Sequence, residues 1–130
     1  MVSTGRSAYR DRNMELSLLS DADGVLHVGV SGRISGSELH LTTDPLKQLL
    51  GPEVYTTKVL INLEMANMVD SSGVGWLISS QRKFSQAGGM MVLHSIPPMV
   101  RSVLMLLRMD RVFNFAEDFV IARELVLRGQ

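Results

Sequence analysis

Alternating apolar and polar positions near the N-terminus predict a β-hairpin. Hydrophobic side chains recur at about every second position through Glu15–Ser20 and again through Val25–Val30, which is the period of a half-buried strand. The intervening Asp21-Ala22-Asp23-Gly24 supplies Asp and Gly residues, which tolerate the dihedral angles of a tight turn. A loop rich in Ser, Gly and Arg is expected to follow, from Ser31 to Ser37.

Beyond residue 40, compact apolar runs alternate with longer segments of helical spacing. The apolar runs predict three strands, at Lys58–Leu63, Met90–His94 and Val112–Phe115. The periodic segments predict four helices: a short one that Thr42 or Thr43 caps and that ends at Gly51, then Ser72–Ala87, Pro97–Arg108 and Glu117–Leu127. A loop is expected between Leu63 and Asp70. A hairpin followed by alternating helices and strands indicates an α/β fold with a mixed sheet and helices packed against it.

The length and composition suit one domain. The chain has 130 residues, of which 45% are hydrophobic and 20% charged, enough apolar surface for a buried core. Residues 1–13 are polar and are expected to form a flexible tail, with the domain spanning residues 14–130. Because the N-terminus has no apolar stretch of a signal peptide and no run is long enough for a membrane span, we expect a cytoplasmic protein.

The charged and metal-ligating residues exclude several classes of partner and cofactor. Thirteen basic residues balance thirteen acidic ones, so no long-range field favours nucleic acid or an anionic membrane. The absence of cysteine excludes disulfides and thiolate metal sites. His27 and His40 sit alone, without metal-ligand spacing. We expect no metal and no cofactor, and recognition of a partner through a local surface.

The tetrapeptide Asp70-Ser71-Ser72-Gly73 is the most informative segment, because it joins a buried strand to a helix. Asp and Ser oxygens cap the first free N–H groups of a helix, and this structural role alone explains many such sequences. The position also suits regulation, because the positive end of the helix dipole tolerates a phosphate there without unfolding the helix.

The same helix carries the single tryptophan of the chain. At about 100° per residue, one side of the helix, expected to face the sheet, carries Val74, Leu77, Ile78, Gln81 and Phe84, and the other carries Trp76, Ser79, Ser80 and Lys83. Trp76 is therefore predicted to point away from the core, one turn from Ser71. It either forms a binding hot spot, for a partner or a homodimer, or packs against a neighbouring helix or the tail.

Residues 58–113 resemble the STAS domain of bacterial anti-sigma-factor antagonists. The likeness rests on a strand reading VLINL, the DSSGVG motif, and Gly88-Gly89 before a strand. It continues through Val100–Leu104 and Met109–Phe113. Two positions depart from the family pattern. The first loop reads Gly32-Arg33-Ile34-Ser35 where Gly-Glu-Leu-Asp is usual, and Arg108 stands where a glycine usually ends the third helix.

The resemblance implies partner switching in the regulation of transcription. Such proteins bind a serine kinase that doubles as an anti-sigma factor, and the kinase phosphorylates the first Ser of the motif, here Ser71. Phosphorylation ends the complex, and a metal-dependent serine phosphatase restores it. The partner-binding surface would then include Asp70, Ser72, Gly73, Trp76 and the loop position Ser35.

Two other readings of the sequence remain. In the first, Ser71 is a nucleophile and His94 its base, but the chain lacks a G-x-S-x-G elbow and an evident acid to orient His94, so we do not expect an enzyme. In the second, the domain is an interaction subunit of another assembly, such as a lipid-transport ATPase or another signalling complex, and the unusual loop favours this alternative.

Overall fold

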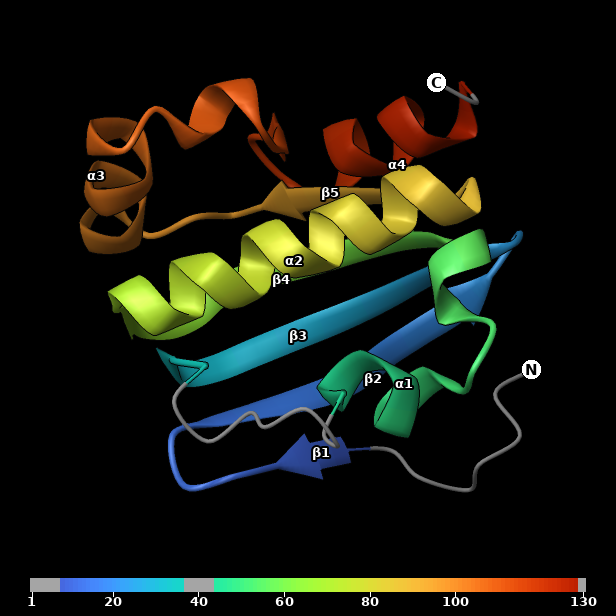
Figure 1. Ribbon diagram of the computed structural model, residues 1–130. Coiled ribbons are helices and arrows are strands. Elements are labelled where there is room, and N and C mark those ends of the chain that lie inside the picture. The colour runs from blue at the N-terminus through green and yellow to red at the C-terminus, as the bar shows by residue number, and fades with distance from the viewer. Residues whose placement is uncertain (1–7, 37–43, 129–130) are drawn as a thin grey trace.

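The computed structural model describes residues 8–36 and 44–128, which form a six-stranded mixed sheet with helices on both faces (Figure 1). The strands lie side by side in chain order. They are β1 (Ala8–Arg10), β2 (Met14–Ala22), β3 (Val25–Ile34), β4 (Lys58–Val69), β5 (Met90–His94) and β6 (Asn114–Ala116). The pairs β1–β2 and β2–β3 are antiparallel, and β3 to β6 are parallel. The predicted α/β fold with a mixed sheet is confirmed.

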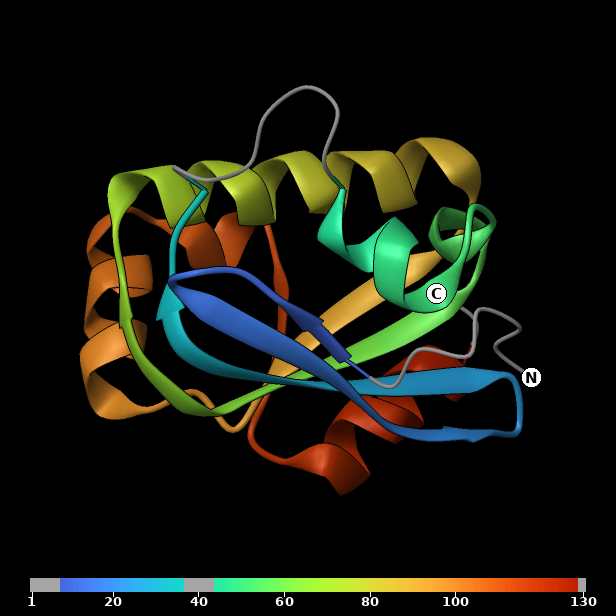
Figure 2. The ribbon, with the colours of Figure 1, turned by 90° about the horizontal axis from the view of Figure 1, so that it is seen from below.

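The helices cover the two faces of the sheet unequally. They are α1 (Pro45–Leu50), α2 (Ser71–Ala87), α3 (Pro98–Leu106) and α4 (Phe119–Leu127), with short 3-10 turns η1 (Val54–Thr56) and η2 (Met109–Arg111). Figure 2 shows α1 and α2 on one face, α4 on the opposite face and α3 at one end. The larger core lies under α1, α2 and α3, and a smaller one lies beneath α4.

The predicted hairpin is confirmed, and its turn explains the local sequence. Asp23 and Gly24 both have positive φ, 58° and 75°, as the two central residues of a type I′ hairpin turn require. Ala22 and Val25 pair directly across it. The turn is tied to α4 because Arg123 donates a hydrogen bond to Asp23 at 2.6 Å.

Two segments predicted as loops are strand. β3 continues to Ile34 and β4 continues to Val69, so the predicted loops after residues 30 and 63 are wrong over these stretches. The extensions pair with each other in parallel, with irregularities at two points along β3. Polar and glycine residues interrupt the apolar alternation in these extensions, so the sequence does not predict them as strands. They form strands because each pairs with the other.

The expected tail is also wrong for residues 8–10. Ala8–Arg10 form β1, in which Tyr9 pairs with Leu16 and is buried. Asp11 then closes the turn to β2 by accepting hydrogen bonds from the backbone N–H groups of Asn13 and Met14. Burial of one aromatic ring thus orders a segment whose composition is otherwise polar.

The caps of the predicted helices are partly as expected. α1 is capped by Asp44, whose side chain accepts from the Lys47 N–H, whereas the predicted Thr42 and Thr43 caps lie outside the described residues. The last strand and the last helix each begin two residues later than predicted, at Asn114 and Phe119. The helix begins there because Asp118 caps it. Asp44 also joins α1 to the rest of the face, because Tyr55 and Lys83 both donate to it.

Candidate functional site

The site lies where β4 ends and α2 begins, and Asp70 holds this corner in place. Its Oδ1 accepts hydrogen bonds from the Gly73 N–H at 2.8 Å and from the Ser72 hydroxyl at 2.6 Å. Partial burial favours the neutral carboxyl group, but these hydrogen bonds outweigh it and hold the pKa of Asp70 well below its usual range. The corner therefore carries a permanent negative charge at the N-terminus of α2.

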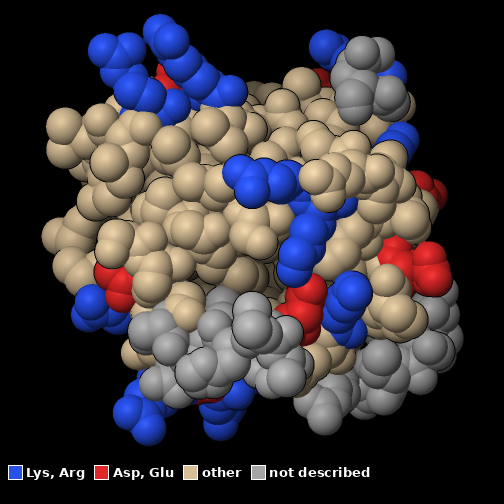
Figure 3. Space-filling model, viewed as in Figure 1, with Lys and Arg blue, Asp and Glu red and all other residues tan. Residues whose placement is uncertain are grey.

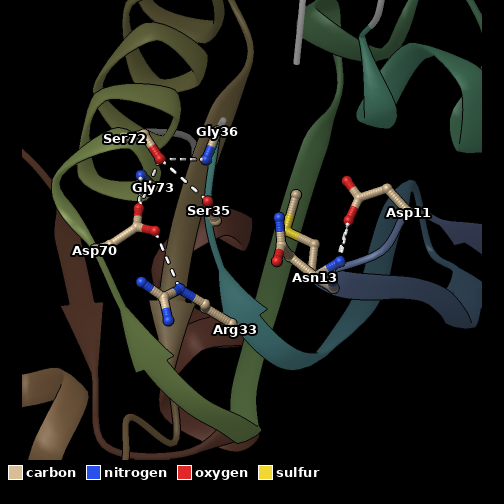
Figure 4. A network of polar contacts seen from close by, with 9 residues as sticks. Asp11, Asn13, Arg33, Ser35, Gly36, Asp70, Ser72 and Gly73 are labelled. Atoms are coloured by element: carbon tan, nitrogen blue, oxygen red, sulfur yellow. Dashed lines mark hydrogen bonds and ion pairs between the residues drawn. The ribbon is translucent and has the colours of Figure 1, made fainter. Parts of the chain in front are cut away.

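Ser72 joins this corner to the end of β3, as Figure 4 shows. Its hydroxyl oxygen accepts a hydrogen bond from the Gly36 N–H at 2.9 Å and lies 3.1 Å from the Ser35 hydroxyl. Because it also donates to Asp70, the Ser72 hydroxyl is occupied as both donor and acceptor. Ser72 is a structural residue, and its hydroxyl is not available for chemistry without breaking the corner.

Ser71 has the opposite environment. It is the first residue of α2 and its side chain is exposed. Within the described part of the chain, no hydrogen bond engages its hydroxyl. Of the two adjacent serines, Ser71 can therefore accept a covalent group without disturbing the cap.

Gly73 allows the close approach of α2 to β3. A Cβ atom at this position would lie 2.0 Å from the carbonyl oxygen of Ile34, and one on Gly36 would lie 2.5 Å from that of Ser72. The Asp70 N–H donates to the same Ile34 carbonyl at 3.2 Å. The motif thus needs glycine at this position because two backbones touch.

Arg33 completes the site from β3. Its Nε donates to Oδ2 of Asp70 at 3.1 Å, an ion pair in which the Arg33 side chain is 50% exposed. Arg33 and Ser35 occupy the loop positions at which the family pattern has Glu and Asp. The structure brings Arg33, Ser35 and the tetrapeptide together, whereas the sequence pattern points to Ser35 and the tetrapeptide without Arg33.

Trp76 differs from its prediction. Its ring is half-buried and packs against the main core, and its Cβ lies 3.5 Å from the position of a Cβ added to Gly36. Ser80, predicted on the outward side, is buried as well. The prediction that Trp76 points away from the core is therefore wrong: the residue packs against the core and remains only partly exposed.

The predicted alternative base, His94, belongs to a different cluster. Its Nε2 lies 2.9 Å from Nε2 of His27 and its Nδ1 lies 2.8 Å from the Ser95 hydroxyl, while the ring of Phe119 packs at a tilt against His27. Both ring nitrogens of His94 are thus engaged away from Ser71. The expectation that His27 sits alone is also wrong, because β3 and β5 direct the two rings toward each other on the face that carries α4.

Neither a metal centre nor a membrane span emerges from residues 8–36 and 44–128. No group of three or more His, Asp or Glu side chains is arranged there to hold a metal ion. Among the helices in those ranges, none combines the length and apolar character needed to cross a bilayer.

On the face in Figure 3, the surface between α3 and the start of α2 is largely uncharged.

The family follows from comparison with known proteins. The family model described as the STAS domain matches residues 19–121, a range that contains the hairpin turn, β3, the corner and the start of α4. The chain belongs to the STAS domain family. The DSSG corner of this STAS domain, with β3 beside it, lies near the middle of the matched range.

Solved structures show the same fold. A Thermotoga maritima protein described as a candidate anti-sigma factor antagonist has a TM-score of 0.70 at 23% identity, with 84% of this chain and 92% of that one covered. An anti-sigma factor antagonist from Mycobacterium paratuberculosis has a TM-score of 0.61 at 26% identity, with coverages of 85% and 93%. The anti-sigma factor antagonist SpoIIAA in its unphosphorylated form has a TM-score of 0.57 at 16% identity, with coverages of 88% and 99%.

Proposed function

We propose that this STAS domain is an anti-sigma-factor antagonist that binds an anti-sigma serine kinase and is released when Ser71 is phosphorylated. The proposal depends on the contrast between two hydroxyls: that of Ser71 is exposed and makes no hydrogen bond to residues 8–36 or 44–128, whereas that of Ser72 is fully engaged. The structural relatives described as anti-sigma factor antagonists support the choice of partner. A metal-dependent serine phosphatase would return the protein to its binding state.

The local geometry supports a switch that alters binding and leaves the fold intact. The hydrogen bonds that cap α2 come from Asp70, Ser72 and the Gly73 amide, and none of them uses the Ser71 hydroxyl. A phosphate on Ser71 would also lie at the positive end of the helix dipole. Phosphorylation is therefore expected to change the surface charge while the corner stays folded.

The added charge is large enough to end a complex. A phosphate contributes about −1.5 to −2 charges beside the ionised Asp70, and a unit charge pair about 5 Å apart interacts by about 3 kcal/mol at an effective dielectric of 20. A hundredfold loss of affinity needs only about 2.7 kcal/mol. Repulsion between the phosphate and an acidic group of the kinase suffices, without a conformational change.

The proposed partner surface contains residues with two different roles. Asp70 and Trp76 are partly accessible and can contact the kinase, whereas Ser35 is 1% exposed and acts by holding Ser72 in place. Gly73 is also buried and contributes the close packing beneath the surface. The contact area would extend along the exposed side of α2, which also offers a surface for a homodimer.

A second candidate function is an interaction subunit of another assembly, such as a lipid-transport ATPase. The observation that favours it is the charge of the loop beside Ser71. Arg33 and the buried Ser35 stand at positions where the antagonist pattern has two carboxylates. A kinase that recognises those carboxylates would meet the basic side chain of Arg33 instead.

Phosphorylation by an anti-sigma serine kinase of the same genome tests the proposal. With purified kinase and ATP, we expect the label on Ser71 by peptide mapping, and none on the Ser71→Ala variant. Ser79→Ala is the matched control, since Ser79 is exposed on the same helix, and it should be labelled like the original protein. Label only on Ser72, or none with any such kinase of the genome, would refute the proposal.

Binding measurements with the same kinase give the second half of the test. Ser71→Asp should weaken binding about a hundredfold with little change in thermal stability, whereas Ser79→Asp should leave the affinity unchanged. Equal affinities for the two variants would contradict the switch. Stable binding to a transporter ATPase, with no binding to the kinase, would instead establish the second candidate.

A further inference from the structure

The Arg33 guanidinium is only partly used by its ion pair. One nitrogen, Nε, donates to Oδ2 of Asp70, and Figure 4 shows this as the single contact drawn from the group. The side chain is 50% exposed, against 24% for Asp70. Since a guanidinium has five N–H donors in a planar fork, the terminal nitrogens of Arg33 have donors to offer a second anion.

Ser71 directly follows the residue that Arg33 binds. Asp70 and Ser71 are consecutive, so their Cα atoms are about 3.8 Å apart, and the guanidinium that bonds to Asp70 is anchored one residue from the position that would carry the phosphate. The backbone fixes this proximity, because the Asp70 N–H donates to Ile34, the residue after Arg33, at 3.2 Å. The end of β3 and the start of α2 are thus held together.

Asp70 can release Arg33 without loss of the helix cap. Its two capping hydrogen bonds use Oδ1, whereas the bond to Arg33 uses Oδ2. Phosphorylation would place a second and larger negative charge beside this carboxylate. A phosphate accepts paired hydrogen bonds from a guanidinium and attracts it more strongly than a singly charged carboxylate.

We propose that Arg33 receives the phosphate on Ser71, exchanging its contact with Asp70 for one with the phosphate oxygens. This inference rests on the proposed phosphorylation of Ser71 and adds a residue that regulates it. Arg33 neutralises part of the phosphate charge within the protein. It therefore limits how strongly phosphorylation repels the partner, and it transmits the modification from α2 to the end of β3.

The phosphate ionisation tests this role without any kinase. The full chain is made with phosphoserine inserted at position 71 during translation, and the second ionisation of the phosphate, ordinarily at a pKa of about 6, is followed by phosphorus NMR against pH. We expect this pKa to be about one unit lower in the original protein than in the Arg33→Gln variant. Arg33→Lys should give an intermediate value, because it keeps the charge and loses the planar fork.

The control is Arg101→Gln, which removes an exposed arginine from α3 and should leave the phosphate pKa unchanged. Equal values for the original protein and Arg33→Gln would overturn the role of Arg33. A folded, unphosphorylated Arg33→Gln protein, checked by thermal unfolding, excludes a loss of structure as the cause.

The two proposals fail in different ways. If no anti-sigma kinase of the genome labels Ser71, the proposed function is refuted. The NMR comparison would still show whether Arg33 contacts a phosphate at position 71. Kinase labelling with no Arg33 effect on the phosphate would refute only the inference about Arg33.

Discussion

At the scale of single residues, the corner distinguishes neighbours that the sequence makes look alike. Ser71 and Ser72 are adjacent and identical in type, and they differ because Ser35 and Gly36 reach only Ser72. The tetrapeptide itself was recognisable as a helix cap from its composition. The family resemblance implies different roles for the two serines, but the physical difference between them comes from a contact between residues 36 positions apart, which no local pattern contains.

The two glycines of the DSSGVG motif provide a prediction at this scale. Gly73→Ala should destabilise the protein by about 3 kcal/mol or prevent folding, because its Cβ would lie 2.0 Å from the backbone oxygen of Ile34. Gly75→Ala should instead stabilise α2 by about 0.5–1 kcal/mol, since nothing lies within 4 Å of its added Cβ.

Urea unfolding of the two variants checks this contrast. Similar stabilities would show that α2 can move away from β3, and that the close backbone approach is not required by the fold.

At the scale of elements, the helices and buried strands follow from the sequence, while the strand lengths do not. The hairpin, α2 and β5 have apolar periodicity and terminating residues of their own, so local physics suffices to predict them. The outer halves of β3 and β4 lack a regular pattern, and they are strands because each supplies the hydrogen-bonding partner of the other. For the same reason β1 exists only where β2 is available to pair with it.

The end of α3 carries a strained residue that a substitution can relieve. Arg108 has φ 60° and ψ 32°, the left-handed region in which a side chain costs roughly 1 kcal/mol. Arg108→Gly should raise the free energy of unfolding by about 0.5–1 kcal/mol.

The matched control is Arg111→Gly in η2, where no strain is present and glycine should lower stability by up to about 1 kcal/mol. Chemical denaturation of both variants decides the matter. A loss of stability in both would show that Arg108 contributes a contact that outweighs its backbone strain.

At the scale of the whole molecule, the histidine pair connects strands that are not neighbours. His27 on β3 and His94 on β5 meet across β4, and Phe119 at the start of α4 covers them. Burial and the proximity of His94 lower the pKa of His27 to about 4, and burial lowers that of His94, while Asp118 of α4 opposes the latter shift. Both rings therefore resist protonation in the folded protein.

This pair predicts acid sensitivity with a defined direction. The unfolded chain takes up protons on both rings below a pH of about 6.5. In the folded protein His27 resists protonation until the pH approaches 4, and the pKa of His94 is lowered as well. Stability is thus present above pH 6.5 and is lost as the pH falls toward 4. After allowance for solvent screening of the half-buried His27, we expect a loss of about 1–2 kcal/mol between pH 7 and 5.

Thermal unfolding against pH measures this loss. His27→Gln should flatten the dependence over that interval, because it removes one of the two buried ionisable rings. An unchanged slope in the variant would show that other groups cause the acid sensitivity.

Local patterns along the chain predict the α/β class, the hairpin, the main helices and the position of the DSSG corner, because these depend on periodicity and on residues close together in the chain. Contacts across the fold set which serine is engaged by the end of β3, where Arg33 lies and how the histidines pair. They also determine how far β3 and β4 extend. Each of these depends on atoms from distant parts of the chain that meet only after the sheet has formed. The different environments of Ser71 and Ser72, two adjacent and chemically identical side chains, therefore arise from packing and hydrogen bonding across the fold.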